Sequence, residues 1–115
     1  MAHGKTILIL GGGIGGVVAA SRLRQRLPRE HRVVLVEREA DFVFQPSLLW
    51  LMIGERTRNT ISRPIARLKE HGVEIVRGTV ERIDPARRTA TVNGKEWPAE
   101  YLVIALGAEL APETV

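Results

Sequence analysis

Three glycines near the amino terminus have a spacing that predicts a loop able to bind an anion. They follow the pattern Gly11-x-Gly13-x-x-Gly16, directly after the apolar run from Ile7 to Leu10. In such a loop the first glycine permits a tight turn, the second lets the backbone approach a pyrophosphate, and the third lets the following helix lie close to the sheet. The pattern predicts an anion site made of backbone amides; the alternative is a flexible turn that binds nothing.

Glu37 supplies a second functional group further along the chain. It follows the stretch from Arg32 to Val36, which predicts a second buried strand. The interval from Gly16 to Glu37 is close to the ~20 residues expected for a carboxylate that accepts hydrogen bonds from both hydroxyls of an adenosine ribose. Because a carboxylate there would repel a 2′-phosphate, FAD or NAD is favoured over NADP. The alternative is an ordinary solvated charge at the end of a strand.

A helix must connect these two strands. Apolar residues recur at helical spacing before Pro28, small ones first and larger ones after, at Gly16, Ala20, Leu23 and Leu27. The amino-terminal amides of this helix, together with the positive end of its dipole, would point at the glycine loop. We therefore expect a Rossmann-type half-unit whose cofactor-binding loop contains Gly11, Gly13, Ile14, Gly15 and Gly16.

Two further helices are predicted between residues 42 and 72. The segment from Phe42 to Gly54 is too apolar for an ordinary loop, and it predicts a short buried helix after Pro46, with Ser47 near its amino end. This segment is either plain core or the lining of a ring-shaped cofactor or an apolar substrate, since sites for such ligands have mostly apolar walls. The next helix is expected to begin near Ser62 to Pro64 and to end at Gly72.

Strand signals dominate the rest of the chain. A small antiparallel excursion is expected up to Trp97, with a hairpin turn at Asn93-Gly94 and strand segments at 73–77, 80–83 and 89–92. A last buried strand is predicted from Tyr101 to Leu106, and it ends at Gly107.

Composition limits the class of protein. With 115 residues, 44% of them hydrophobic, the chain can bury one modest core, so a single domain over residues 1–115 is expected. The net charge is +4, but the arginines are scattered and the aromatic content is 4%, which argues against a nucleic-acid partner. The arginines are therefore expected on the solvated surface, among them Arg22, Arg24, Arg26, Arg29, Arg56, Arg63, Arg77 and Arg87.

Several other kinds of site are not expected. The chain has no cysteine, which excludes disulfides, thiolate metal sites and thiol redox chemistry within it. The three histidines lack the paired spacing of a metal site. No signal peptide is visible, and the longest apolar run, Leu48 to Ile53, is far shorter than the ~20 residues that span a bilayer. A cytoplasmic protein is expected.

The order of these features resembles the amino-terminal FAD-binding half-domain of the pyridine nucleotide-disulfide oxidoreductase superfamily, flavoproteins with two dinucleotide-binding domains. The likeness is carried by the glycine loop, Val36 to Arg38, Gly78 to Val80, and Tyr101 to Gly107. Within the superfamily, the stretches 44–50, 54–56 and 61–64 look most like sulfide:quinone oxidoreductases, with type II NADH:quinone dehydrogenases next. The resemblance implies a three-layer α/β fold with a parallel central sheet and a small antiparallel β-meander, in an incomplete form.

The resemblance also implies roles for individual residues. The glycine loop would hold the FAD pyrophosphate, and Glu37, with Arg38 beside it, would hold the adenosine ribose. Val80 would meet the adenine edge through its backbone. The remaining cofactor contacts would come from Pro46 and Ser47 near the flavin end and from the backbone of Ala105 to Gly107, where Leu106 replaces the usual threonine.

The chain is much shorter than the members of the families that it resembles. Members of these families run to several hundred residues and add a second domain, a later strand that completes the flavin site, and a part that contacts the membrane. We therefore expect a piece of a longer enzyme that passes electrons from sulfide or NADH to a quinone and is peripheral on the membrane. Residues 42–53 would contact the missing domain or a second copy, and no catalytic residue is identified. The alternative is a stand-alone module that binds FAD, NAD or ADP without turnover; a purely structural assembly partner is a third possibility.

Overall fold

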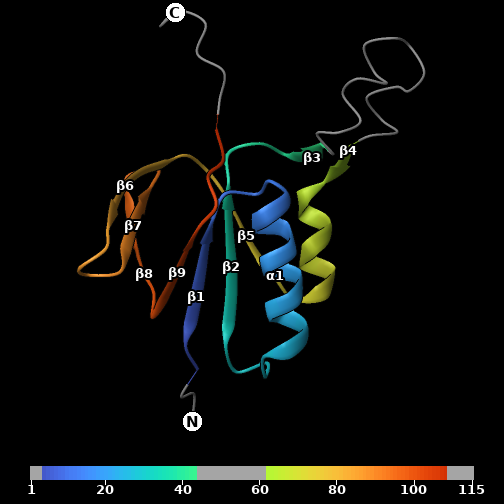
Figure 1. Ribbon diagram of the computed structural model, residues 1–115, viewed down its shortest axis with the longest axis horizontal. Coiled ribbons are helices and arrows are strands. Elements are labelled where there is room, and N and C mark those ends of the chain that lie inside the picture. The colour runs from blue at the N-terminus through green and yellow to red at the C-terminus, as the bar shows by residue number, and fades with distance from the viewer. Residues whose placement is uncertain (1–3, 44–61, 109–115) are drawn as a thin grey trace, which may run out of the picture.

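The computed structural model describes residues 4–43 and 62–108, and its centre is a four-stranded parallel sheet. The strands lie in the order β5-β2-β1-β9 (Figure 1), and every neighbouring pair is parallel. Their bounds are Thr6–Leu10 for β1, Arg32–Glu37 for β2, Glu74–Arg77 for β5 and Tyr101–Ile104 for β9. The apolar run that ends at Leu10 thus forms a central strand with a neighbour on each side, as predicted.

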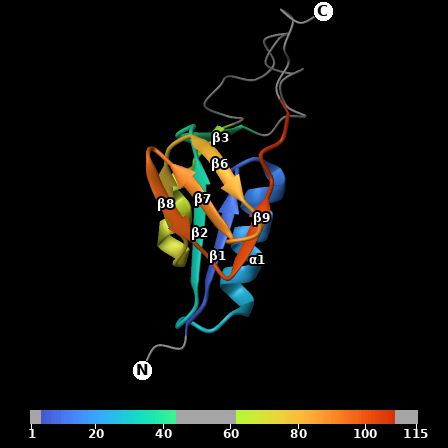
Figure 2. The same ribbon diagram turned by 90° about the vertical axis from the view of Figure 1, so that its left-hand side faces the viewer.

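The sheet is the middle of three layers. Helix α1 (Ile14–Arg26) and the 3-10 helix η2 (Ile65–His71) cover one face. A meander of β6 (Val80–Asp84), β7 (Thr89–Val92) and β8 (Lys95–Pro98) covers the other (Figures 1 and 2). Each central strand faces both layers in alternation: Ile7 and Ile9 pack with Ala20 of α1, whereas Leu8 and Leu10 pack with the meander. The expected three-layer α/β fold is confirmed.

The polypeptide around residue 62 differs from the prediction of a helix start. Strand β3 (Asp41–Val43) pairs antiparallel with β4 (Ser62–Pro64), and η2 begins only at Ile65. Pro64 has extended backbone angles and lies opposite Asp41, so the helix cannot start before it. The predicted end is confirmed, because Gly72 caps η2 in the left-handed conformation.

Two predicted strands have a different place in the sheets. The segment 73–77 was expected within the antiparallel excursion, but β5 pairs parallel with β2 and forms one edge of the central sheet. The predicted buried strand 101–106 is the opposite edge: β9 ends at Ile104, and Tyr101 and Ile104 are 54% and 59% exposed because no strand among the described residues pairs beyond them. The hairpin at Asn93-Gly94 is confirmed, with positive φ angles of 51° and 78°.

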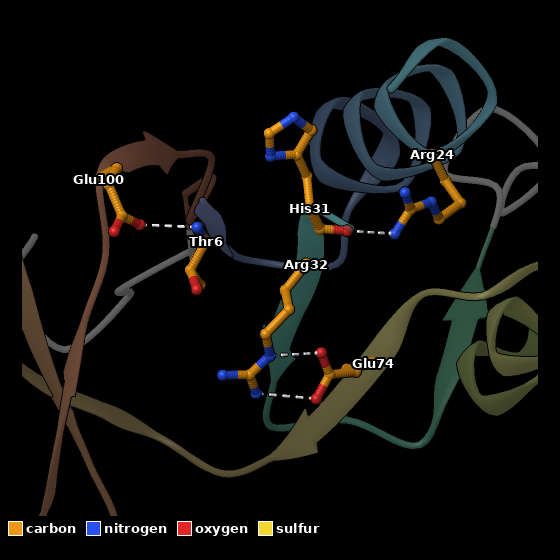
Figure 3. Close-up of polar contacts among 6 residues, drawn as sticks. All are labelled: Thr6, Arg24, His31, Arg32, Glu74 and Glu100. Atoms are coloured by element: carbon orange, nitrogen blue, oxygen red, sulfur yellow. Dashed lines mark hydrogen bonds and ion pairs between the residues drawn. The ribbon is translucent and has the colours of Figure 1, made fainter. Parts of the chain in front are cut away.

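Polar contacts hold the amino-terminal ends of the parallel strands (Figure 3). Arg24, predicted to be solvated, is 6% exposed, and its guanidinium donates to the carbonyls of His31 at 2.7 Å and Pro28 at 2.8 Å. These carbonyls lie in the turn that follows α1, and the hydrogen bonds to them compensate the buried guanidinium for its loss of water. Arg32 donates to Glu74 through two hydrogen bonds of 2.8 Å, which lowers the pKa of the Glu74 carboxyl.

The predicted buried helix after Pro46 and most of the apolar segment 42–53 lie outside the described residues. In the parts of the chain that the structure describes, no helix is long and apolar enough to cross a membrane.

Candidate nucleotide-binding site

The three motif glycines have different surroundings in the structure. Gly11 has a φ of +106°, and a Cβ there would collide with the backbone of Ala105. Gly16 is buried in α1, and a Cβ on it would overlap the carbonyl oxygen of Gly11. Gly13 is exposed, and no atom lies within 4 Å of the position that its Cβ would take. Two glycines therefore fit the loop to the fold, while Gly13 leaves open space at the loop's surface.

The first turn of α1 borders the open space beside Gly13. Gly13 is the N-cap residue, so no side chain caps the first turn, and the first turn contains no acidic residue. The amides of Ile14, Gly15 and Gly16 belong to this turn, where helical amides have no intrahelical acceptor. With free amides at the positive end of the helix dipole and no acidic residue in the turn, the turn is suited to an anion.

Glu37 lies at the carboxyl end of β2 and contacts the loop directly. Its Oε1 accepts a hydrogen bond of 2.9 Å from the Gly12 amide, and its Oε2 accepts one of 2.9 Å from the Glu39 amide. Each carboxylate oxygen keeps a second lone pair, so Glu37 can also accept from a ligand hydroxyl. The carboxylate thus orders the loop and is available to a ligand.

Gly12 was not assigned a role from the sequence, although it lies within the glycine run. It is buried, and a Cβ on it would come within 2.9 Å of both Glu37 Cγ and Ile65 Cδ1. A side chain at this position would force Glu37 or Ile65 to shift, so glycine favours the close approach of the loop to Glu37. The signal in the sequence was the middle glycine of the run 11–13, which the spacing rule leaves unexplained.

The loop and Glu37 border a groove of ≈ 900 Å³ at the carboxyl ends of the parallel strands, the upper end of the sheet in Figure 1. Ligands of open α/β sheets bind at this end. Of the predicted site residues, those that line the groove are Gly13, Ile14, Glu37, Arg38, Val80 and Gly107. Phe42, from the segment expected to be core or the lining of a cofactor, lines the groove as well. Thr79 also lines it and had no predicted contact.

The other predicted residues occupy different positions. Gly11 and Gly16 lie beneath the loop and shape it, and Gly15 is exposed in the first turn of α1. Ala105 donates its amide to the Leu10 carbonyl at 2.8 Å and so continues the pairing of β9 with β1 below the groove. Pro46 and Ser47 lie outside the described residues.

Residues 78–80 form the far wall of the groove, and hydrogen bonds join this part of the chain to the end of β2. The Gly78 amide donates to the Glu37 carbonyl at 3.0 Å, and Arg77 Nη2 donates to the Arg38 carbonyl at 3.0 Å. The turn after β5 is therefore held against the end of β2. It directs Thr79 and Val80 to the groove.

This combination of features defines a domain with a Rossmann-type fold: a glycine loop between β1 and α1, an acidic residue at the end of β2, and a groove at the carboxyl edge of a parallel sheet. The sequence matches the pyridine nucleotide-disulphide oxidoreductase family over residues 5–114. The chain belongs to this family, which confirms the resemblance inferred from its motifs.

Individual relatives agree with the family assignment. A sulfide-quinone reductase of Aquifex aeolicus is 35% identical over 92% of this chain and 25% of the relative, and a type II NADH:quinone oxidoreductase of Haemophilus influenzae is 31% identical over 91% and 27%. The solved structure of the sulfide:quinone oxidoreductase from Aquifex aeolicus superposes with a TM-score of 0.87 at 35% identity, over 93% of this chain and 25% of that one. The chain thus spans about a quarter of the length of these relatives.

Proposed function

We propose that the chain binds FAD in this groove, as the FAD-binding domain of a longer oxidoreductase that passes electrons from sulfide or NADH to a quinone. Family membership supports the proposal, as do relatives named for sulfide-quinone and NADH:quinone reduction. The observation that carries it is a convergence in one groove: an uncapped helix amino terminus, open space at Gly13, and the Glu37 carboxylate.

The groove residues fit the adenosine diphosphate half of FAD. The pyrophosphate would lie over Gly13 and accept hydrogen bonds from the first-turn amides of α1, which have no capping side chain. The ribose hydroxyls would donate to Glu37, whose oxygens keep free lone pairs. The adenine would lie along Thr79 and Val80, and Arg38, which lines the groove, would border the ribose.

The flavin half would extend beyond these residues. The backbone of Ala105 to Gly107 would lie beside the flavin half, and Pro46 and Ser47 are proposed to approach it from the apolar segment. FAD, when bound, supplies two-electron redox chemistry, and this chain supplies binding and orientation. Because the chain has no cysteine, thiol chemistry for a sulfide donor would have to come from another part of a longer protein.

The quinone places the whole protein at a lipid surface in this proposal, since long-chain quinones partition into membranes. Peripheral attachment would be made by a part outside residues 1–115. Within this chain, residues 42–53 are proposed to contact that part or a second copy, and the described members of this segment include Phe42, which lines the groove.

Isothermal titration calorimetry of the 115-residue chain with FAD and with ADP tests the proposal. Both ligands should bind, because both carry the adenosine and pyrophosphate that the groove fits, and 2′-phospho-ADP should bind more weakly than ADP because its phosphate would face Glu37. A chain purified with FAD should also retain visible flavin absorption. If neither FAD nor ADP binds, the proposed function is refuted.

A further inference from the structure

We infer that Asn93, at the tip of the meander hairpin, is a positioning residue for the adenine wall of the groove; this inference rests on the proposed function. Asn93 lies in the turn between β7 and β8, more than ten residues from any residue that lines the groove. Neither the motif spacing nor the family resemblance gave it a role beyond its turn. Its side chain nevertheless reaches the segment that forms the wall.

The Asn93 amide bridges two backbone groups of that segment. Its Nδ2 donates to the Arg77 carbonyl at 3.1 Å, and its Oδ1 accepts from the Thr79 amide at 3.3 Å. Gly78 lies between these two residues, and a Cβ there would come within 2.8 Å of Asn93 Cγ. The absence of a side chain at Gly78 is what lets the Asn93 amide sit against the wall.

The next residue of the turn strengthens the same link. The Gly94 amide donates to Glu81 Oε1, and Glu81 lies where the pairing of β6 with β7 shifts register between Val80 and Arg82. The hairpin tip therefore contacts the chain on both sides of Val80. It fixes where β6 starts and how Val80 meets the groove.

These contacts extend to the glycine loop. On its other side, the segment that forms the wall is hydrogen-bonded to the end of β2. The Gly78 amide donates to the Glu37 carbonyl, and Arg77 Nη2 donates to the Arg38 carbonyl. Glu37 in turn holds the Gly12 amide. Because the Asn93 side chain links the meander to Arg77 and Thr79, its loss should loosen the adenine wall and leave the loop in place.

The turn conformation allows this to be tested without disturbing the hairpin. Asn93 has a φ of 51°, which glycine adopts freely, so Asn93→Gly removes the amide and keeps the backbone. Arg88→Gly is the matched control: Arg88 has a φ of 53° in the other turn of the meander, and its side chain also donates to a backbone carbonyl, that of Glu100. Arg88 does not line the groove.

NMR titration with ADP and with inorganic pyrophosphate gives the first test. Asn93→Gly should weaken ADP roughly tenfold, the penalty for ordering about one residue of backbone on binding, and leave pyrophosphate affinity unchanged. Arg88→Gly should bind both like the wild type. Equal ADP affinity in Asn93→Gly and the wild type overturns the inference alone. Failure of the wild type to bind ADP overturns the proposed function.

Amide hydrogen exchange on the free chain tests the positioning role without a ligand. In Asn93→Gly the Thr79 amide should exchange faster, while amides paired between β7 and β8 should keep their protection. Gly78→Ala should have the same effect, because its Cβ displaces the Asn93 amide, and the double variant should add nothing further. Unchanged Thr79 exchange in Asn93→Gly, or fully additive effects, would overturn the inference.

Discussion

Replacing Gly13 with serine should make the chain slightly more stable and its nucleotide affinity much lower. The N-cap position has extended backbone angles, φ −76° and ψ −166°, and open space around the missing side chain, so serine fits without strain. Serine caps a helix better than glycine by a few tenths of a kcal/mol, which corresponds to a melting temperature about 1–3 °C higher.

The same serine would occupy the amides that the pyrophosphate needs. Each charge-assisted hydrogen bond to a phosphate is worth about 1.5–3 kcal/mol, so loss of one weakens ADP roughly ten- to a hundredfold. Gly13→Val, which brings two methyl groups into that space, should abolish binding. Calorimetry with ADP and thermal unfolding of the free chain measure the two effects separately.

Gly16→Ala provides the contrasting control. Its Cβ would overlap the Gly11 carbonyl oxygen, so α1 must move from the loop. Alanine gains about 1 kcal/mol in helix propensity, but displacement of a packed backbone costs about 1–3 kcal/mol or more, so the free chain should lose stability. If Gly13→Ser binds ADP as tightly as the wild type does, the pyrophosphate does not lie at this helix end and the reasoning is refuted.

Three other substitutions, and two measurements on the unaltered chain, test different parts of the structure. Glu37→Ala should weaken ADP by about tenfold or more and bring 2′-phospho-ADP closer to it; an unchanged preference would return Glu37 to the role of a solvated charge. Arg24→Met should lower the free energy of unfolding by about 2 kcal/mol or more in chemical denaturation, because carbonyls after α1 lose their donor; a neutral effect would show that water replaces it. Arg32 lowers the pKa of Glu74, so the stability that this pair contributes is complete above the ordinary Glu pKa of 4.5 and falls as the pH drops through the folded-state pKa. The melting temperature of Glu74→Gln should therefore depend less on pH in acid than that of the wild type. Identical pH profiles of the two proteins would contradict this. Light scattering should detect self-association through residues 42–53, and a monomer in solution would exclude it. The same chain loaded with FAD should show no quinone reduction.

The sequence predicts most of the site because its geometry follows from local rules. The spacing of Gly11, Gly13 and Gly16 defines a strand, a turn and a helix, and Glu37 comes one helix and one strand later. Parallel strands with both faces covered are apolar throughout, so β1 and β2 are recognisable without knowledge of their neighbours. The carboxyl ends of those strands then determine where the groove lies.

The predictions that fail concern partners distant in the sequence. Arg24 is buried because the carbonyls of Pro28 and His31 surround it, which the charge of an arginine cannot reveal. Tyr101 has the strand pattern of a core residue, yet β9 is an edge and Tyr101 is half exposed. Pairing of β3 with β4 likewise joins segments separated by the residues 44–61, and no local signal specifies it.

The pairing of β1 with β9 determines when the groove can form during synthesis. β1 is made first, but its second neighbour, Tyr101–Ile104, is made near the end of the chain, and the Ala105 backbone fits beneath Gly11 only after that. Closing so long a loop is slow compared with the local pairing in the meander hairpins. A ribosome-bound chain that stops before residue 101 should therefore expose one edge of β1 and should not yet select a nucleotide. The glycine loop, encoded first, is among the last parts of the domain to reach its final shape.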